Sequence, residues 1–146
     1  MAKKIFNTKY VTTIVIILFV VSMLLPAVYI RDYDGYRSMY GYELALFGAI
    51  AFLGGGILEF VIWLSNLLFI FSIFLGFDKS RSALFPGFSA IALSLSFSLW
   101  KTVLVSENGR EAEVLSLSSG YYLWISSIIL WNIFLLYRKD DLSSER

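Results

Sequence analysis

Residues 44–76 form an almost unbroken apolar run, in which Glu59 carries the one carboxylate and Asn66 the one amide. A bilayer core needs only about 20 helical residues. A run of this length must therefore tilt, kink or fold back at one surface. Together with three further apolar segments, it predicts an integral membrane protein of the helical type.

The composition agrees with that class and limits the kinds of catalysis and metal binding that the chain can support. The chain is 58% hydrophobic and 18% aromatic, well above the ordinary soluble mix. Its formal net charge is +1, so it offers no basic surface for nucleic acid. It contains no Cys and no His, which removes thiolate metal sites, the commonest metal ligand and the commonest general base. We expect no cofactor and no metal, and most enzyme mechanisms are excluded.

The predicted fold class is an all-α integral membrane protein with four transmembrane helices, formed as one domain over residues 1–146. The first apolar segment has the polarity of a signal peptide, but it is longer than the usual apolar region and lacks an Ala-x-Ala site. We therefore interpret it as a retained span, with a cleaved signal as the alternative. The four spans are predicted at residues 11–30, 57–76, 84–105 and 120–137.

Three consecutive glycines, Gly54, Gly55 and Gly56, divide the long run, because glycine is unfavourable inside helices and permits tight turns. We expect residues 43–53 to form a short re-entrant or interfacial helix on the outer side, before the second span. Apolar pieces of this length are typical of such segments. The competing interpretation is a single long tilted helix.

The distribution of Lys and Arg predicts the orientation, because these residues favour the cytoplasmic side. The two tails and the short turn at residues 77–83 contain eight of the Lys and Arg residues, whereas the intervening loops contain three Arg and more Asp and Glu than that. Both termini are therefore expected in the cytoplasm. The basic residues on that side are Lys3, Lys4, Lys9, Lys79, Arg81, Arg138, Lys139 and Arg146.

Two ionisable residues, Glu59 and Lys101, lie within predicted spans, where charges are costly and mark functional sites. Counted from the short turn, both rise roughly 26 Å, so they are expected to pair near the outer surface. Asn66 and Ser94 each lie seven residues lower, about two helical turns, and are expected to meet near the midplane. We interpret the four residues as packing contacts between the second and third spans, with a transport pathway as the alternative. A Ser–Lys catalytic dyad is disfavoured, because pairing with Glu59 would keep Lys101 charged.

Tyrosine is dense in the polar segment after the first span. An interfacial belt is the simplest explanation for tyrosines beside a span, and a binding surface for a partner is the alternative. The tyrosines of that possible partner surface are Tyr33, Tyr36, Tyr40 and Tyr42.

Three short strings occur in order along the chain: Gly-Tyr-Glu-Leu from Gly41, Trp-Leu-Ser-Asn from Trp63, and Gly-Tyr-Tyr-Leu-Trp from Gly120. Taken together, they resemble strings of small four-span inner-membrane proteins of bacteria. The relatives often have Pro after the Asn, whereas Leu67 follows it here. The resemblance implies a bacterial inner-membrane location and no particular activity.

The leading functional prediction is a non-enzymatic membrane protein that acts through contacts, as an accessory subunit, a regulator or an immunity-type protein. Besides the lipid bilayer, its partner would be another membrane protein or a second copy of itself, and not nucleic acid. The alternative is a small oligomeric channel or transporter. An enzyme acting on lipid or peptide ranks last.

Overall fold

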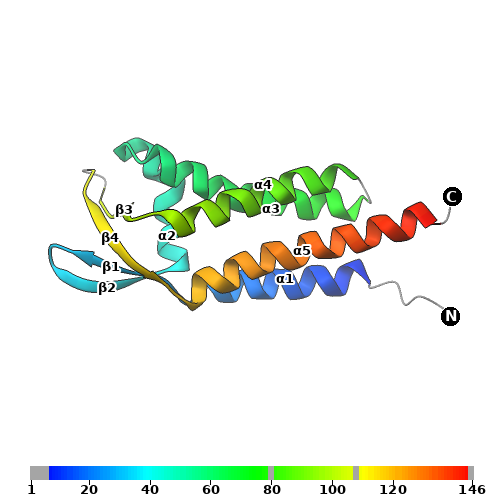
Figure 1. Ribbon diagram of the computed structural model, residues 1–146, viewed down its shortest axis with the longest axis horizontal. Helices are drawn as coiled ribbons and strands as arrows, with labels where there is room; N and C mark the ends of the chain where they lie inside the picture. The colour runs from blue at the N-terminus through cyan, green and yellow to red at the C-terminus, as the bar shows by residue number, and fades with distance from the viewer. Residues whose placement is uncertain (1–6, 79–80, 107–108, 145–146) are drawn as a thin grey trace.

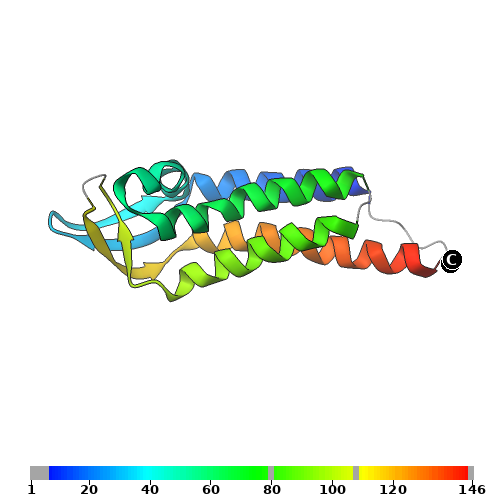
Figure 2. The same cartoon turned by 90° about the horizontal axis from the view of Figure 1, so that it is seen from above.

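The computed structural model describes residues 7–78, 81–106 and 109–144. Helices run side by side along the length of the molecule, and an antiparallel sheet extends from one end of them (Figures 1 and 2). The elements in chain order are α1 (Thr8–Met23), β1 (Pro26–Asp32), β2 (Gly35–Tyr40), α2 (Gly41–Ile50), η1 (Ala51–Gly54), α3 (Ile57–Phe77), η2 (Arg81–Ala83), α4 (Leu84–Ser96), η3 (Phe97–Leu99), β3 (Thr102–Leu104), β4 (Glu111–Leu117) and α5 (Ser119–Ser144).

The prediction of an all-α fold with four spans is wrong. The chain is a mixed α/β protein whose four strands form one sheet in the order β2-β1-β4-β3. Among the described helices, two are long and apolar enough to cross a membrane, α3 and the Ser119–Arg138 part of α5. The helices α1 and α4 are apolar but have only 16 and 13 residues.

The prediction of a first span over residues 11–30 is wrong for its second half. The helix ends at Met23, and Pro26 opens β1 instead. Proline has no N–H to continue a helix, and the Val28-Tyr29-Ile30 stretch has the β-branched and aromatic residues that suit a strand. Val28 and Ile30 are fully buried while Tyr29 is half exposed, the alternation of a sheet with one covered face.

The third predicted span, residues 84–105, also ends early, because the chain leaves the helix after Leu99 and forms β3. The segment expected to be a polar loop, residues 106–119, contains β4. That strand pairs with β3 on one side and with β1 on the other. The alternation Glu-Ala-Glu-Val from Glu111 is typical of a strand. The segment was predicted as a loop because it is polar.

The predicted break in the long apolar run is confirmed. The short helix α2 passes into η1, the chain turns at Gly55, and α3 begins at Ile57. Gly55 has φ +88°, a left-handed conformation that a residue with Cβ adopts only at a cost. The second span, predicted over residues 57–76, agrees with α3 to within one residue, and the fourth, over 120–137, forms the first part of the longer α5.

Two buried clusters hold the molecule together. One lies under the sheet and includes Ile30 and Met39, while the other lies inside the helices and includes Phe69 and Trp131. In the helical cluster α1 packs on α5 and α3 packs on α4. Trp131 donates a 3.0 Å hydrogen bond to Ser72 Oγ, which stabilises the contact between α5 and α3.

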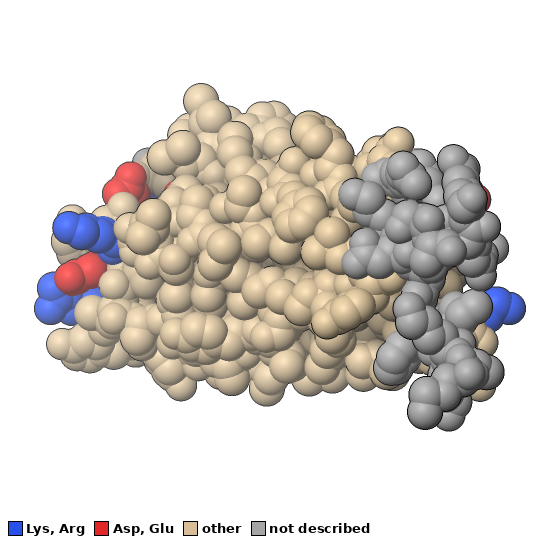
Figure 3. Space-filling model, turned by 45° about the vertical axis from the view of Figure 1, so that its right-hand side comes forward, with Lys and Arg blue, Asp and Glu red and all other residues tan. Residues whose placement is uncertain are grey.

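The sides of the helices expose many large apolar side chains, and charges gather toward the ends of the molecule (Figure 3). The long uncharged stretches of sequence cover residues 10–30, 44–58, 60–77, 82–100 and 114–137. At the end away from the sheet, Arg138 donates to the Gly76 carbonyl at 2.8 Å and reaches Thr8 Oγ1 at 3.4 Å. The end of α5 therefore lies beside the start of α1.

Candidate functional site

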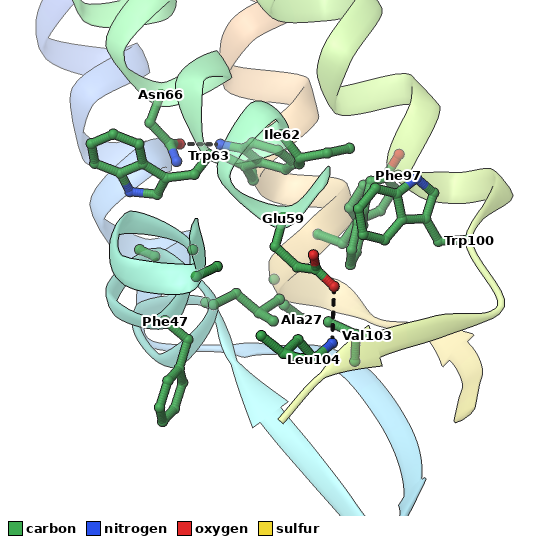
Figure 4. Close-up of a pocket in the computed structure, with 18 of the residues that line it drawn as sticks. Ala27, Phe47, Glu59, Ile62, Trp63, Asn66, Phe97, Trp100, Val103 and Leu104 are labelled. Atoms are coloured by element: carbon green, nitrogen blue, oxygen red, sulfur yellow. Dashed lines mark hydrogen bonds between the residues drawn. The ribbon is translucent and has the colours of Figure 1, made fainter. Parts of the chain in front are cut away.

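A cavity of about 100 Å³ lies where the helices meet the sheet. Residues of α2 and the start of α3 form one side, and the ends of the other helices and β3 close it (Figure 4). Its lining is overwhelmingly apolar and contains six aromatic side chains. These are Phe47, Trp63, Phe97, Trp100, Tyr121 and Trp124.

Glu59 provides the one carboxylate among the residues that line this cavity. Its Oε1 accepts a 3.0 Å hydrogen bond from the backbone N–H of Leu104 (Figure 4). Among the described residues, no hydrogen bond reaches its other carboxylate oxygen, Oε2. The side chain therefore joins α3 to β3 and retains one oxygen that can accept a donor.

The predicted ion pair between Glu59 and Lys101 does not form between these described residues. Lys101 lies beyond the end of η3 and is exposed. The predicted depth assumed a continuous helix as far as Lys101, at 1.5 Å per residue. Because the chain becomes extended at Trp100, that count no longer places the two charges together.

Asn66 and Ser94 likewise contact α5 rather than each other. Asn66 Oδ1 accepts a 2.9 Å hydrogen bond from Trp124 Nε1. The Ser94 hydroxyl donates to Ile91 O within its own helix, while the Ser94 carbonyl accepts from the Tyr121 hydroxyl at 3.0 Å. The prediction paired the two residues directly and missed their hydrogen-bond partners on α5, Trp124 and Tyr121.

A second, more exposed groove adjoins the cavity. Three charged residues line it, Glu59, Lys101 and Glu111. The residues that line both hollows are Gly54, Glu59, Trp100 and Leu104. Since Glu59 belongs to both, its carboxylate stands at the junction between an apolar interior and a charged outer groove.

The tyrosines predicted to form a partner surface lie on the β1–β2 hairpin and at its junction with α2. Tyr33, in the hairpin turn, is 90% exposed, and Tyr36 is 75% exposed. Tyr40 and Tyr42 are partly exposed, and their rings stack with centroids 5.8 Å apart. Thus the hairpin presents aromatic side chains to its surroundings.

Charged side chains continue this surface across the sheet. Arg31 faces Tyr36 on β2 and Glu113 on β4, and its guanidinium donates a hydrogen bond to the Glu113 carboxylate. The hydrogen bond with Tyr36 and the nearby charge of Glu113 raise the pKa of Arg31. At the turn, Arg110 pairs with Asp32 at 3.2 Å. Tyr36, Arg31 and Glu113 are therefore cross-strand neighbours on one face of the sheet.

Trp100, Tyr121 and Trp124 line the cavity but were not among the predicted site residues. The spacing of Trp124 and Trp131 could have indicated a shared role, because residues seven apart lie on the same helix face. In the structure both indoles donate hydrogen bonds to α3 side chains.

The fold and the cavity define a class of structure, a helical bundle that carries an antiparallel sheet at one end. A scan against protein-family models found no match. Searches of curated proteins and of solved structures found no significant similarity.

Proposed function

We propose that this chain is a membrane protein that acts by contact and presents its tyrosine-bearing sheet to a partner protein. The observation that carries the proposal is the combination of an apolar helical body with a sheet at one end that exposes Tyr33 and Tyr36 beside the Arg31–Glu113 pair. Tyr and Arg, together with Trp, are enriched among the side chains that dominate protein interfaces.

The bilayer placement rests on α3 and α5. They have mean hydropathies of 2.2 and 1.4 over their most apolar windows. An α3 of 21 residues extends for about 30 Å, which is the thickness of a hydrocarbon core. Exposed apolar side chains on these helices, and on the shorter α1 packed beside them, would contact lipid rather than water.

The orientation follows from the basic residues of the sequence. The end at which α1 begins and α5 ends is opposite the sheet (Figure 1). The sequence before α1 and the last residues of the chain contain Lys3, Lys4, Lys139 and Arg146, and Lys and Arg beside a span favour the cytoplasmic side. The proposal therefore places both termini in the cytoplasm of a bacterial cell and the sheet on the outer side of its inner membrane.

The sheet surface suits a protein partner, either another membrane protein or a second copy of this chain. Tyrosine provides a large amphipathic contact area at a low cost in conformational entropy. The tyrosines near the tip of the hairpin are too exposed to serve the core of this chain. An activity of its own is not part of the proposal, since a chain without His or Cys lacks the usual base and thiol nucleophile.

Site-specific photo-crosslinking tests this proposal. A photoreactive phenylalanine derivative replaces Tyr33 or Tyr36 in living cells, and the same replacement at Tyr137 serves as a control. Tyr137 is 72% exposed, but it lies at the opposite end of the helices. We expect one discrete protein adduct from the two hairpin positions and not from Tyr137. Identical adduct patterns at all three positions would contradict a partner surface on the hairpin.

A further inference from the structure

We propose that the cavity and the outer groove together bind one zwitterionic phospholipid, with hydrocarbon in the cavity and an ammonium–phosphate head at Glu59 and Lys101. This site is separate from the tyrosine surface of the hairpin. The inference rests on the bilayer placement proposed above and is independent of any protein partner.

The cavity has the size and lining of a hydrocarbon site. An apolar cavity of about 150 Å³ stays dry and takes up benzene in a well-studied engineered protein, and this one is of similar order, about 100 Å³. Its walls are formed by indole and phenyl rings and by small residues of α2. A segment of an acyl chain fits that chemistry, because burying it removes apolar surface from water.

The outer groove has the chemistry of a zwitterionic head. Glu59 Oε2 has no hydrogen-bond partner among the described residues, and its carboxylate can accept from an ammonium group. Lys101 lines the same groove, is exposed, and takes part in no ion pair with another described residue, so its own ammonium is available for a phosphate. Charge-assisted hydrogen bonds of this kind are roughly twice as strong as neutral ones.

The connection between the two hollows joins these halves into one site. A lipid has its apolar and charged parts covalently linked, so its site needs an apolar pocket that opens directly onto charged groups. Glu59 and Trp100 line both hollows, and Figure 4 shows the Glu59 side chain between α3 and the strand that bears Leu104. A free soluble anion or a free amine would use only half of this arrangement.

Native mass spectrometry of the full chain in detergent tests the proposal with four probes. Phosphatidylethanolamine carries ammonium, phosphate and tails, whereas phosphatidylglycerol lacks the ammonium and diacylglycerol lacks both charges. Phosphoethanolamine supplies the head alone. We expect one retained equivalent of phosphatidylethanolamine, weaker retention of the other two lipids, and no retention of the free head.

Three variants locate the site. Glu59→Gln keeps an oxygen for the Leu104 N–H but loses the charge, so retention of phosphatidylethanolamine should fall about tenfold while that of phosphatidylglycerol is unchanged. Ala45→Leu fills the cavity from α2 and should lower retention of every lipid, whereas Ala49→Leu, on the same helix but outside the lining, should not.

Three outcomes would overturn the proposal. Equal retention of all lipids by every variant would mean that lipid binds only to the outside of the helices. Retention that responds to Ala45→Leu but not to Glu59→Gln would refute the head assignment. Binding of phosphoethanolamine alone would show a soluble ligand. None of these results bears on the adducts expected from the hairpin tyrosines, so the two proposals fail separately.

Discussion

Asn132 is 2% exposed within α5. Its Nδ2 donates to the Ile128 carbonyl of its own helix at 2.9 Å, while its Oδ1 has no hydrogen-bond partner among the described residues. The Asn132 amide fits between the helices because Gly87 on α4 has no side chain. A Cβ added at Gly87 would meet three atoms of the Asn132 side chain and would lie 2.2 Å from Oδ1. A glycine and an amide thus share one space between two helices.

We predict that Gly87→Ala destabilises the protein by about 1–3 kcal/mol through overpacking, although alanine is the better helix former. The double variant Gly87→Ala with Asn132→Ala should recover most of that loss, since it removes the atoms that clash. A double-mutant cycle of unfolding in detergent measures the coupling.

Ser89, which is partly buried on the same helix, provides the control. Ser89→Ala removes a hydroxyl that donates to Phe85 within α4, and it should change stability by no more than about 0.5 kcal/mol. Additive effects of Gly87→Ala and Asn132→Ala would show that the two residues do not share this space.

At the candidate site, the sequence identified the polar residues but not their partners. Glu59 and Asn66 are conspicuous because a carboxylate and an amide interrupt an apolar run, and both line the cavity. Their partners are a backbone N–H in β3 and an indole in α5. Neither has a signature in the sequence, because a backbone donor is present in nearly every residue and an indole beside a span suits the membrane interface equally well.

Among the elements, the helices were far easier to predict than the strands. A long apolar run such as α3 is read correctly from hydropathy, and so is the break at consecutive glycines. Short apolar strands such as β1 have the same hydropathy as a buried piece of helix. Strand pairing distinguishes them, and of the two strands that pair with β1, β2 follows at once but β4 is more than eighty residues away along the chain.

Neighbouring residues of β1 lie on opposite faces of the sheet, so their substitution should change stability by different amounts. Ile30 is fully buried beneath the sheet, so Ile30→Ala should cost about 2–5 kcal/mol. Arg31 points outward, and its pair with Glu113 is about half exposed, so Arg31→Ala should cost no more than about 1 kcal/mol. Denaturant unfolding of the two variants compares them directly, and equal losses would contradict the assignment of the faces.

At the scale of the whole molecule, the sheet and the end at which α5 terminates should lie on opposite sides of the bilayer. The chain has no cysteine of its own, so single cysteines report position without background. We predict that an impermeant thiol reagent labels Ser38→Cys and Ser116→Cys without disruption of the inner membrane, but labels Tyr137→Cys only after the membrane is permeabilised. Ser80, in the turn that was expected to be cytoplasmic, lies outside the described residues.

The reverse labelling pattern would place the sheet in the cytoplasm and refute the orientation. Labelling of all three positions before permeabilisation would instead contradict the bilayer placement itself. The two failures are therefore distinct.

The strand order β2-β1-β4-β3 also has a consequence for the time at which the fold can be completed. The β1–β2 hairpin needs only neighbouring residues and can form as soon as Tyr40 leaves the ribosome, since hairpins form within microseconds. Its second edge stays open until β4 has been made, because Val28 pairs with Leu117. During that interval the nascent chain exposes an unpaired strand that can associate with a neighbouring chain. The final strand to be synthesised is thus the one that closes the sheet.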